Sequence, residues 1–273
     1  MSELSKRILV AVPAATLVLY LTWLGGWYFK IPMILAGLLI VRETAHLFEV
    51  ADQPPSAYFP YTIGLWILLI PDIPHPFQIG LLILLLFLLL QLPKSPAESV
   101  RALGSTIFSG VYAPIGILTI LSVRLQIIPE HGFILTLCLL LMVWGNDIFA
   151  YFGGKGFGKH PMAPNISPKK TWEGFGFGVL GALAGFAICR YLVPLPLPLT
   201  LLQGLPAVLL VSTMGPTGDL AASKLKRAGN LKDASNILPG HGGFLDRFDA
   251  LILAAPAFYL YLYLLKFLGY VSV

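Results

Sequence analysis

Long uninterrupted apolar runs constrain the fold of this chain more than any other feature of its sequence. The run from Gly80 to Leu90, for example, contains only glycine and large apolar residues. Inside lipid a backbone can satisfy its polar groups only within helices or closed barrels, and barrel strands alternate apolar with polar residues. Solid runs of this kind therefore predict helices that span a membrane.

The composition supports a membrane protein. Hydrophobic residues make up 57% of the 273 residues and charged residues only 11%, whereas a soluble domain carries about 25% charged residues. Such scarce charge excludes a soluble domain, a disordered chain and a nucleic-acid-binding module. The two cysteines, Cys138 and Cys189, lie within apolar runs, which favours buried apolar side chains over a disulfide or a metal site.

We count nine candidate spans, with Pro and Gly at most of the joins, and predict an all-α polytopic bundle of about nine transmembrane helices. The candidate spans are residues 8–24, 31–50, 58–71, 77–92, 102–123, 132–152, 172–192, 199–220 and 248–268. We expect residues 1–125 to form a scaffold of about five spans. Residues 126–273 would form the catalytic part, with cytoplasmic loops at 153–171 and 221–247.

The positions of the basic residues orient these spans. With nine spans, 13 of the 18 Lys and Arg residues fall on the side of the N-terminus, four fall on the other side, and Arg42 lies within a span. Loops rich in Lys and Arg stay in the cytoplasm, so this side is predicted to be cytoplasmic. Nine of the 13 lie after residue 150, which indicates an anionic ligand such as lipid headgroups or a nucleotide.

Acidic residues at the ends of spans are costly and therefore informative. Asp147, Asp219, Asp246 and Asp249 all lie at the predicted cytoplasmic end of a span. Asp246 and Asp249 are three residues apart and share one helix face. Carboxylates that converge from several helices suit a hard cation such as Mg²⁺. Helix capping or pairing with neighbouring Lys and Arg is the alternative for each of them.

A further acid, Glu43, lies within the second candidate span beside Arg42. Adjacent residues do not face each other on a helix, so each needs its own partner or access to water. A structural pair elsewhere in the bundle explains Glu43 at least as well as a function does.

Two segments between the sixth and seventh spans suggest phosphate binding. The run from Gly153 to His160 contains G-x-x-x-x-G-K, but His160 stands where a P-loop needs Ser or Thr, and no strand precedes the run. Its glycine-rich backbone and two lysines can still hold an anion. The second segment has Ser167 and Thr171 as candidate caps of the seventh span, with Lys169 and Lys170 between them. A helix start flanked by lysines suits phosphate, and ordinary capping is the alternative.

The most specific pattern occupies residues 215–249. Two motifs are present, S-x-x-K-R-x-x-x-x-K-D and H-G-G-x-x-D-R-x-D. Their fixed positions are Ser223, Lys226, Arg227, Lys232, Asp233, His241, Gly242, Gly243, Asp246, Arg247 and Asp249. With these motifs, and with Asn146-Asp147, Tyr151 and residues 167–174 upstream, the chain resembles the phosphatidate cytidylyltransferases, also called CDP-diacylglycerol synthases. The resemblance covers residues 145–250.

This resemblance implies a multi-pass transferase of the cell (inner) membrane that faces the cytoplasm and makes CDP-diacylglycerol and pyrophosphate from phosphatidic acid and CTP. It implies Mg²⁺, with a second cation left open, and a homodimer. The catalytic candidates are Asp219, Asp246, Asp249, Lys226, Arg227 and His241. The metal candidates are Asp219, Asp246 and Asp249, with Asp147 either joining them or pairing with a lysine. The substrate-binding candidates are Ser167, Lys169, Lys170, Thr171, Ser223, Lys232, Asp233, Gly242, Gly243 and Arg247.

Two other functions remain as alternatives. An ion-coupled transporter would need polar residues near the middle of several spans, whereas here the polar residues gather at one face of the membrane. A CTP-dependent polyprenol kinase-like enzyme would use a lipid alcohol as acceptor, and the intact H-G-G-x-x-D-R-x-D motif argues against it.

Overall fold

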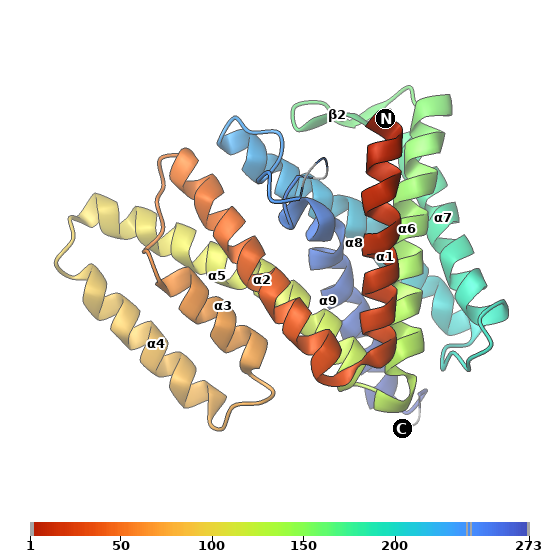
Figure 1. Cartoon of the computed structure of the whole chain (residues 1–273), viewed down its shortest axis with the longest axis horizontal. Helices are drawn as coiled ribbons and strands as arrows, with labels where there is room; N and C mark the ends of the chain where they lie inside the picture. Colours follow the sequence, from red (N-terminus) through yellow and green to blue (C-terminus); the bar gives the residue numbers. More distant parts are fainter. Residues whose placement is uncertain (1–2, 239, 241, 272–273) are drawn as a thin grey trace. The chain divides into compact units, whose positions relative to one another are not determined.

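The chain is predominantly helical, as the sequence predicts (Figure 1). The computed structural model describes residues 3–238, 240 and 242–271, with side chains from residue 12 onward, and this part contains nine α-helices. The helices are α1 (Glu3–Leu24), α2 (Gly26–Val50), α3 (Phe59–Leu69), α4 (Pro76–Gln91), α5 (Pro96–Leu125), α6 (Gly132–Phe157), α7 (Trp172–Tyr191), α8 (Leu201–Ala228) and α9 (Leu245–Phe267). An antiparallel hairpin of β1 (Pro161–Ala163) and β2 (Ser167–Thr171) joins α6 to α7.

Five of the segments described are long and apolar enough to cross a membrane. They are Gly26–Val50, Pro96–Leu125, Pro129–Phe157, Trp172–Tyr191 and Leu245–Phe267. With 11 and 16 residues, α3 and α4 fall short of the roughly 20 residues that span a bilayer. These helices indicate a membrane-embedded protein, while the count of nine spans, and the orientation derived from it, stay predictions.

Two predicted loops are shorter than expected. Helix α6 continues to Phe157, and the hairpin fills most of the rest of the first loop. Helix α8 continues to Ala228 and so carries Ser223 and Lys226 on a helix. The cause is local, since the Ala, Leu and Lys residues after Asp219 are strong helix formers that extend the helix beyond its apolar part.

The chain divides into two compact units that interleave in sequence. The first comprises Met1–Lys30, Thr119–Ser223 and Phe248–Val273. The second comprises Ile31–Leu118 and Lys224–Arg247. The sequence predicted another division, at residue 125, between a scaffold and the helices that carry the motifs. That division stays a prediction.

Within the first unit, α6 and α7 lie side by side and pack through small residues (Figure 1). A Cβ atom added to Gly181 would collide with the carbonyl oxygen of Gly145, and one added to Gly185 would collide with the carbonyl oxygen of Leu141. Small residues at such an interface let helix backbones approach closely inside a membrane. This packing fixes the end of α6 beside the start of α7, where the candidate site lies.

Replacing Gly181 with alanine is expected to destabilise the protein by about 1–3 kcal/mol, because the new methyl group must push the two helices apart. Gly176→Ala on the same helix is the matched control, because a Cβ there meets no heavy atom within 4 Å. That control should be neutral or gain up to about 1 kcal/mol of helix propensity. Thermal unfolding in detergent measures both, and equal melting temperatures would contradict the packing.

In the second unit, α2, α3 and α5 pack closely. A Cβ on Gly64 of α3 would lie 3.1 Å from side-chain atoms of both Val41 of α2 and Pro114 of α5. The chain after α8 also contacts α2, since a Cβ on Gly229 would lie 3.5 Å from the carbonyl oxygen of Leu47. The loop that carries part of the sequence motif is therefore held against α2.

Candidate active site

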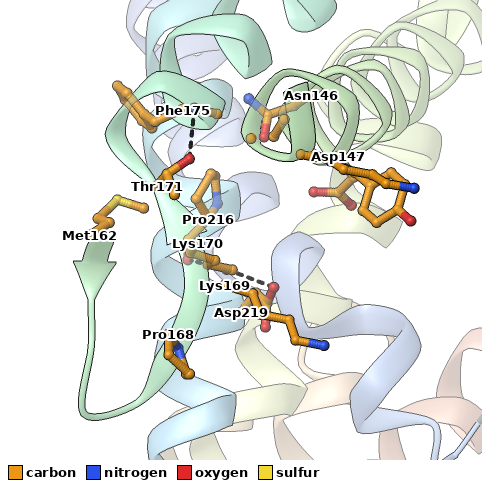
Figure 2. A pocket seen from close by; sticks show the side chains of 15 residues that line it. Asn146, Asp147, Met162, Pro168, Lys169, Lys170, Thr171, Phe175, Pro216 and Asp219 are labelled. Atoms are coloured by element: carbon orange, nitrogen blue, oxygen red, sulfur yellow. Dashed lines mark hydrogen bonds and ion pairs between the residues drawn. The ribbon is translucent and has the colours of Figure 1, made fainter. Parts of the chain in front are cut away.

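A cavity of about 670 Å³ lies in the first unit and gathers several of the predicted site residues (Figure 2). Its walls come from α6, the β1–β2 hairpin, the start of α7, and α8. The charged lining residues are Asp147, Lys155, Lys169, Lys170 and Asp219, and the apolar ones include Met162 and Phe175. The cavity thus combines charge of both signs with apolar surface.

Lys170 and Asp219 form an ion pair at this cavity. The Lys170 Nζ atom lies 2.6 Å from a carboxylate oxygen of Asp219 and donates to the carbonyl oxygen of Pro216 at 3.3 Å. Figure 2 shows the lysine extending from the hairpin toward α8. One turn after Asp219, the Ser223 hydroxyl donates to Asp219 Oδ1 at 3.2 Å. The side chains of Lys170 and Asp219 remain partly exposed, at 24% and 35%, so a ligand can reach them.

Asn146 is a buried lining residue whose role the sequence did not reveal. Pro216 has no N–H to donate to the carbonyl of Ser212 one turn earlier in α8, and Asn146 Nδ2 lies 3.5 Å from that carbonyl oxygen. Asn146 Oδ1 has no hydrogen-bond partner among the residues described. Buried polar atoms nearly always have partners, so this oxygen is available to a donor on a bound ligand.

Two contacts anchor the hairpin that forms one wall of the cavity. Thr171 caps α7, as predicted, because its hydroxyl accepts a hydrogen bond from Gly174 N at 3.1 Å. Ser167 is not a cap, because it begins β2 four residues earlier, and that prediction was wrong. Glu173, in the first turn of α7, accepts hydrogen bonds from the backbone amides of Lys159 and His160 at 3.1 and 3.2 Å. Lys169 and Lys170 therefore extend from a fixed strand.

The glycine run before the hairpin has a packing role. Gly153 and Gly154 lie within α6, where a Cβ on the first would collide with Phe177 and a Cβ on the second would lie 3.2 Å from Thr171 Oγ1. The glycines let the hairpin and α7 approach α6. A P-loop is excluded, as the sequence indicated, because the run is helical as far as Phe157.

Asp249 belongs to the same unit as Asp219. A Cβ on Gly218 would collide with the carbonyl oxygen of Asp249, so α8 and α9 touch next to both acids. Asp249 Oδ1 accepts a hydrogen bond from Ala250 N at 2.8 Å. Asp147 of α6 lines the cavity with Asp219, which makes three predicted acids in the first unit.

Lys226 and Asp246 form a second charged pair, this one in the second unit. Lys226 Nζ lies 2.6 Å from Asp246 Oδ1, and the two side chains are only 9% and 6% exposed. Asp246 Oδ2 accepts hydrogen bonds from Ala234 N and Gly243 N, both at 2.9 Å. Both oxygens of Asp246 are thus engaged by the protein itself.

The glycines of the H-G-G motif pass close to this pair. Gly242 has a φ of +75°, which L residues rarely adopt, and a Cβ there would lie 2.7 Å from Asp246 Oδ2. A glycine is therefore required for the turn itself. His241 lies outside the residues described.

The remaining motif residues lie around this loop. Arg227 Nη1 donates to the carbonyl oxygen of Leu231 at 2.6 Å. Lys232, Asp233 and Arg247 are exposed. The structure thus gathers Asp147, Lys169, Lys170, Thr171 and Asp219 on one cavity of the first unit. Within the second unit it gathers Lys226, Gly242, Gly243 and Asp246.

Carboxylates are the candidate ligands for Mg²⁺. Within the described part of the chain, no three Asp, Glu, His or Cys side chains lie close enough together to hold a metal ion by themselves. Mg²⁺ usually binds one or two carboxylates together with substrate phosphates and water. Asp147 and Asp219, which line one cavity, fit that pattern, and the metal role of Asp246, which binds Lys226 and two backbone amides, stays a prediction.

Comparisons with known proteins agree with the motifs. Residues 5–265 match the model of the cytidylyltransferase family. A phosphatidate cytidylyltransferase of Brucella abortus is 36% identical over 264 residues, which cover 96% of this chain and 94% of the relative. One of Bacillus subtilis is 32% identical over 95% of this chain and 97% of the relative. One of Aquifex aeolicus is 48% identical over 124 residues, or 45% of each chain. The chain therefore belongs to the cytidylyltransferase family, as an enzyme of the phosphatidate cytidylyltransferase type.

Proposed function

We propose that this protein converts phosphatidic acid and CTP into CDP-diacylglycerol and pyrophosphate. The observation that supports this most is the Lys170–Asp219 pair in a cavity that also holds Lys169 and Asp147. The relatives that match nearly the full chain bear the name of this activity. A site for two phosphate-bearing substrates needs cations to hold them and acids to bind a metal, and this cavity has both.

In the reaction, an oxygen of the lipid phosphate forms a bond to the α-phosphorus of CTP. The bond between that phosphorus and the bridging oxygen to the β-phosphate breaks, and the electron pair leaves with pyrophosphate. The lipid phosphate is already ionised near neutral pH, so no general base is required. The main obstacles are repulsion between two anions and the charge on the leaving group.

The residues of the cavity address both obstacles. Lys169 and Lys170 would hold phosphate oxygens and offset their repulsion, with the hairpin fixing their position. Asp219, with Asp147 or Asp249, would hold Mg²⁺, which when bound neutralises phosphate charge. Asn146 Oδ1 would accept a hydrogen bond from a donor on a bound substrate. Ser223 would keep the Asp219 carboxylate oriented.

The membrane setting suits these substrates. Phosphatidic acid stays in the bilayer, whereas CTP is dissolved in the cytoplasm, so the reaction must occur where headgroups meet water. The cavity lies at the end of α6 and the start of α7, two of the segments long enough to span a membrane. The excess of Lys and Arg in the loops on the side of the N-terminus, which includes the loop between α6 and α7, favours a site that faces the cytoplasm. The same proposal holds that the protein is a homodimer in the cell membrane.

The proposal is tested with purified protein in detergent micelles that contain phosphatidic acid. We expect CDP-diacylglycerol to form with CTP and Mg²⁺, and not when EDTA removes the metal or another nucleotide replaces CTP. A polyprenol in place of phosphatidic acid should give no product. Phosphorylation of the polyprenol would favour the kinase-like alternative. Solute uptake into liposomes without nucleotide turnover would favour a transporter.

A further inference from the structure

Glu43 is an acid that the proposed reaction does not use. It lies on α2 in the second unit, is 3% exposed, and falls within a segment long enough to span a membrane. A buried carboxylate is costly unless hydrogen bonds satisfy it. The identity of its partners therefore indicates its purpose.

Three donors from one distant loop satisfy this carboxylate. Ser235 Oγ donates to Oε1 at 2.6 Å, Phe244 N donates to Oε1 at 2.9 Å, and Leu245 N donates to Oε2 at 2.6 Å. Leu245 is the first residue of α9. The first amides of a helix lack partners within the helix and carry partial positive charge, so an anion stabilises them. Glu43 thus caps α9 from another helix.

The same loop is held by a second carboxylate. Asp246 binds the amides of Ala234 and Gly243 and the Nζ atom of Lys226. Glu43 binds Ser235, next to Ala234, and Phe244, next to Gly243. The two acids therefore hold both ends of the stretch between residues 234 and 245, which carries the H-G-G motif.

Gly243 shows how closely the loop passes over Glu43. A Cβ on Gly243 would lie 2.5 Å from Glu43 Oε1 and 2.7 Å from Oε2. Real Cβ atoms essentially never show contacts under 3.0 Å, so a neighbouring atom must shift. A side chain at position 243 would therefore have to displace the Glu43 carboxylate.

We propose that Glu43 is a positioning residue that sets the conformation of the loop between α8 and α9. It acts through Phe244, Leu245 and Ser235, and it makes no contact with substrate. Its effect on the rate rests on the proposed function, because the loop matters for activity only if its motif residues serve that reaction.

The test compares Glu43→Gln with Glu49→Gln, a matched control on the same helix whose side chain is 57% exposed. Glutamine would turn an NH₂ group toward amides that also donate, so the loop should shift. A misplacement of this kind is expected to lower kcat for CDP-diacylglycerol formation about tenfold, with KM for CTP changed less. Glu49→Gln should leave both constants unchanged.

A double-mutant cycle separates positioning from general damage. Gly243→Ala should lower kcat like Glu43→Gln, and the double variant should be no worse than either single one, because both disturb one contact. The proposal would be overturned if the double variant lost kcat by the product of the two single losses. A Glu43→Gln protein with wild-type kcat would overturn it as well. If Glu43→Gln fails to fold, Ser235→Ala removes one donor only, and a wild-type kcat there would count against the proposal in the same way.

A readout without substrates keeps this inference distinct from the proposed function. Trypsin should cleave after the exposed Lys232 faster in Glu43→Gln than in wild type or Glu49→Gln, because the loop is released. Equal cleavage rates would overturn the positioning role even in an active enzyme. An inactive wild-type protein with faster cleavage in the variant would instead contradict the proposed function alone.

Discussion

Replacing Asp219 with asparagine is expected to lower the rate of CDP-diacylglycerol formation by about 10²–10³-fold, the loss seen when one preorganised charge-stabilising group is removed from an active site. Asparagine keeps the shape of the side chain but loses the negative charge that pairs with Lys170 at 2.6 Å and suits Mg²⁺. The Mg²⁺ concentration that gives half-maximal activity should rise as well. Initial rates across a Mg²⁺ titration measure both effects.

The matched control is Asp52→Asn, which removes the same charge from a side chain that is 97% exposed. Asp52 has a φ of 58°, and asparagine tolerates this left-handed conformation as well as aspartate does. The control should keep wild-type activity and Mg²⁺ dependence. An Asp219→Asn enzyme with wild-type rate at every Mg²⁺ concentration would remove Asp219 from the site.

Replacing Lys226 with methionine is expected to destabilise the protein by about 3–5 kcal/mol, because it leaves the carboxylate of Asp246 buried without its cation. The pair is nearly fully enclosed, at 9% and 6% side-chain exposure. Methionine preserves most of the length and apolar volume of the lysine stem, so the lost charge dominates the effect. Thermal or denaturant unfolding in detergent measures the change.

Lys224→Met provides the comparison, because Lys224 is exposed on the same helix two residues earlier. A surface change of this kind stays within about 0.5 kcal/mol. Adding Asp246→Asn to Lys226→Met should restore part of the stability, since it removes the uncompensated charge. Equal melting temperatures for Lys226→Met and Lys224→Met would show that the pair of Lys226 and Asp246 does not contribute to stability.

Much of the fold was predictable from sequence because it depends on local patterns. Apolar runs placed the helices, and Thr171 was predicted as a cap from its position before an apolar stretch. Helices α6 and α8 continue beyond the predicted spans 132–152 and 199–220, because apolar content marks where lipid ends and not where a helix ends. The residues after Asp219 favour helix strongly, so α8 continues to Ala228.

The candidate site was predictable only in part. Motif spacing pointed to Lys226, the end of a span pointed to Asp219, and an expected helix start pointed to Lys170. None of these signals reveals the partners of a side chain. The contacts of Glu43 join positions 192 to 202 residues apart in sequence, and no periodicity links them. The pattern predicted Asp246 as a metal ligand, but it did not reveal that its oxygens accept hydrogen bonds from Lys226 and two backbone amides. Long-range pairing of this kind depends on the packing of whole helices.

The position of label transfer from CTP tests the central claim most directly. Purified protein is supplied with phosphatidic acid, Mg²⁺ and CTP that carries radioactive phosphorus at either the α or the γ position. The account predicts that α label enters the lipid while γ label leaves entirely as pyrophosphate. Transfer of γ label to lipid, or label in lipid from neither position, would contradict it.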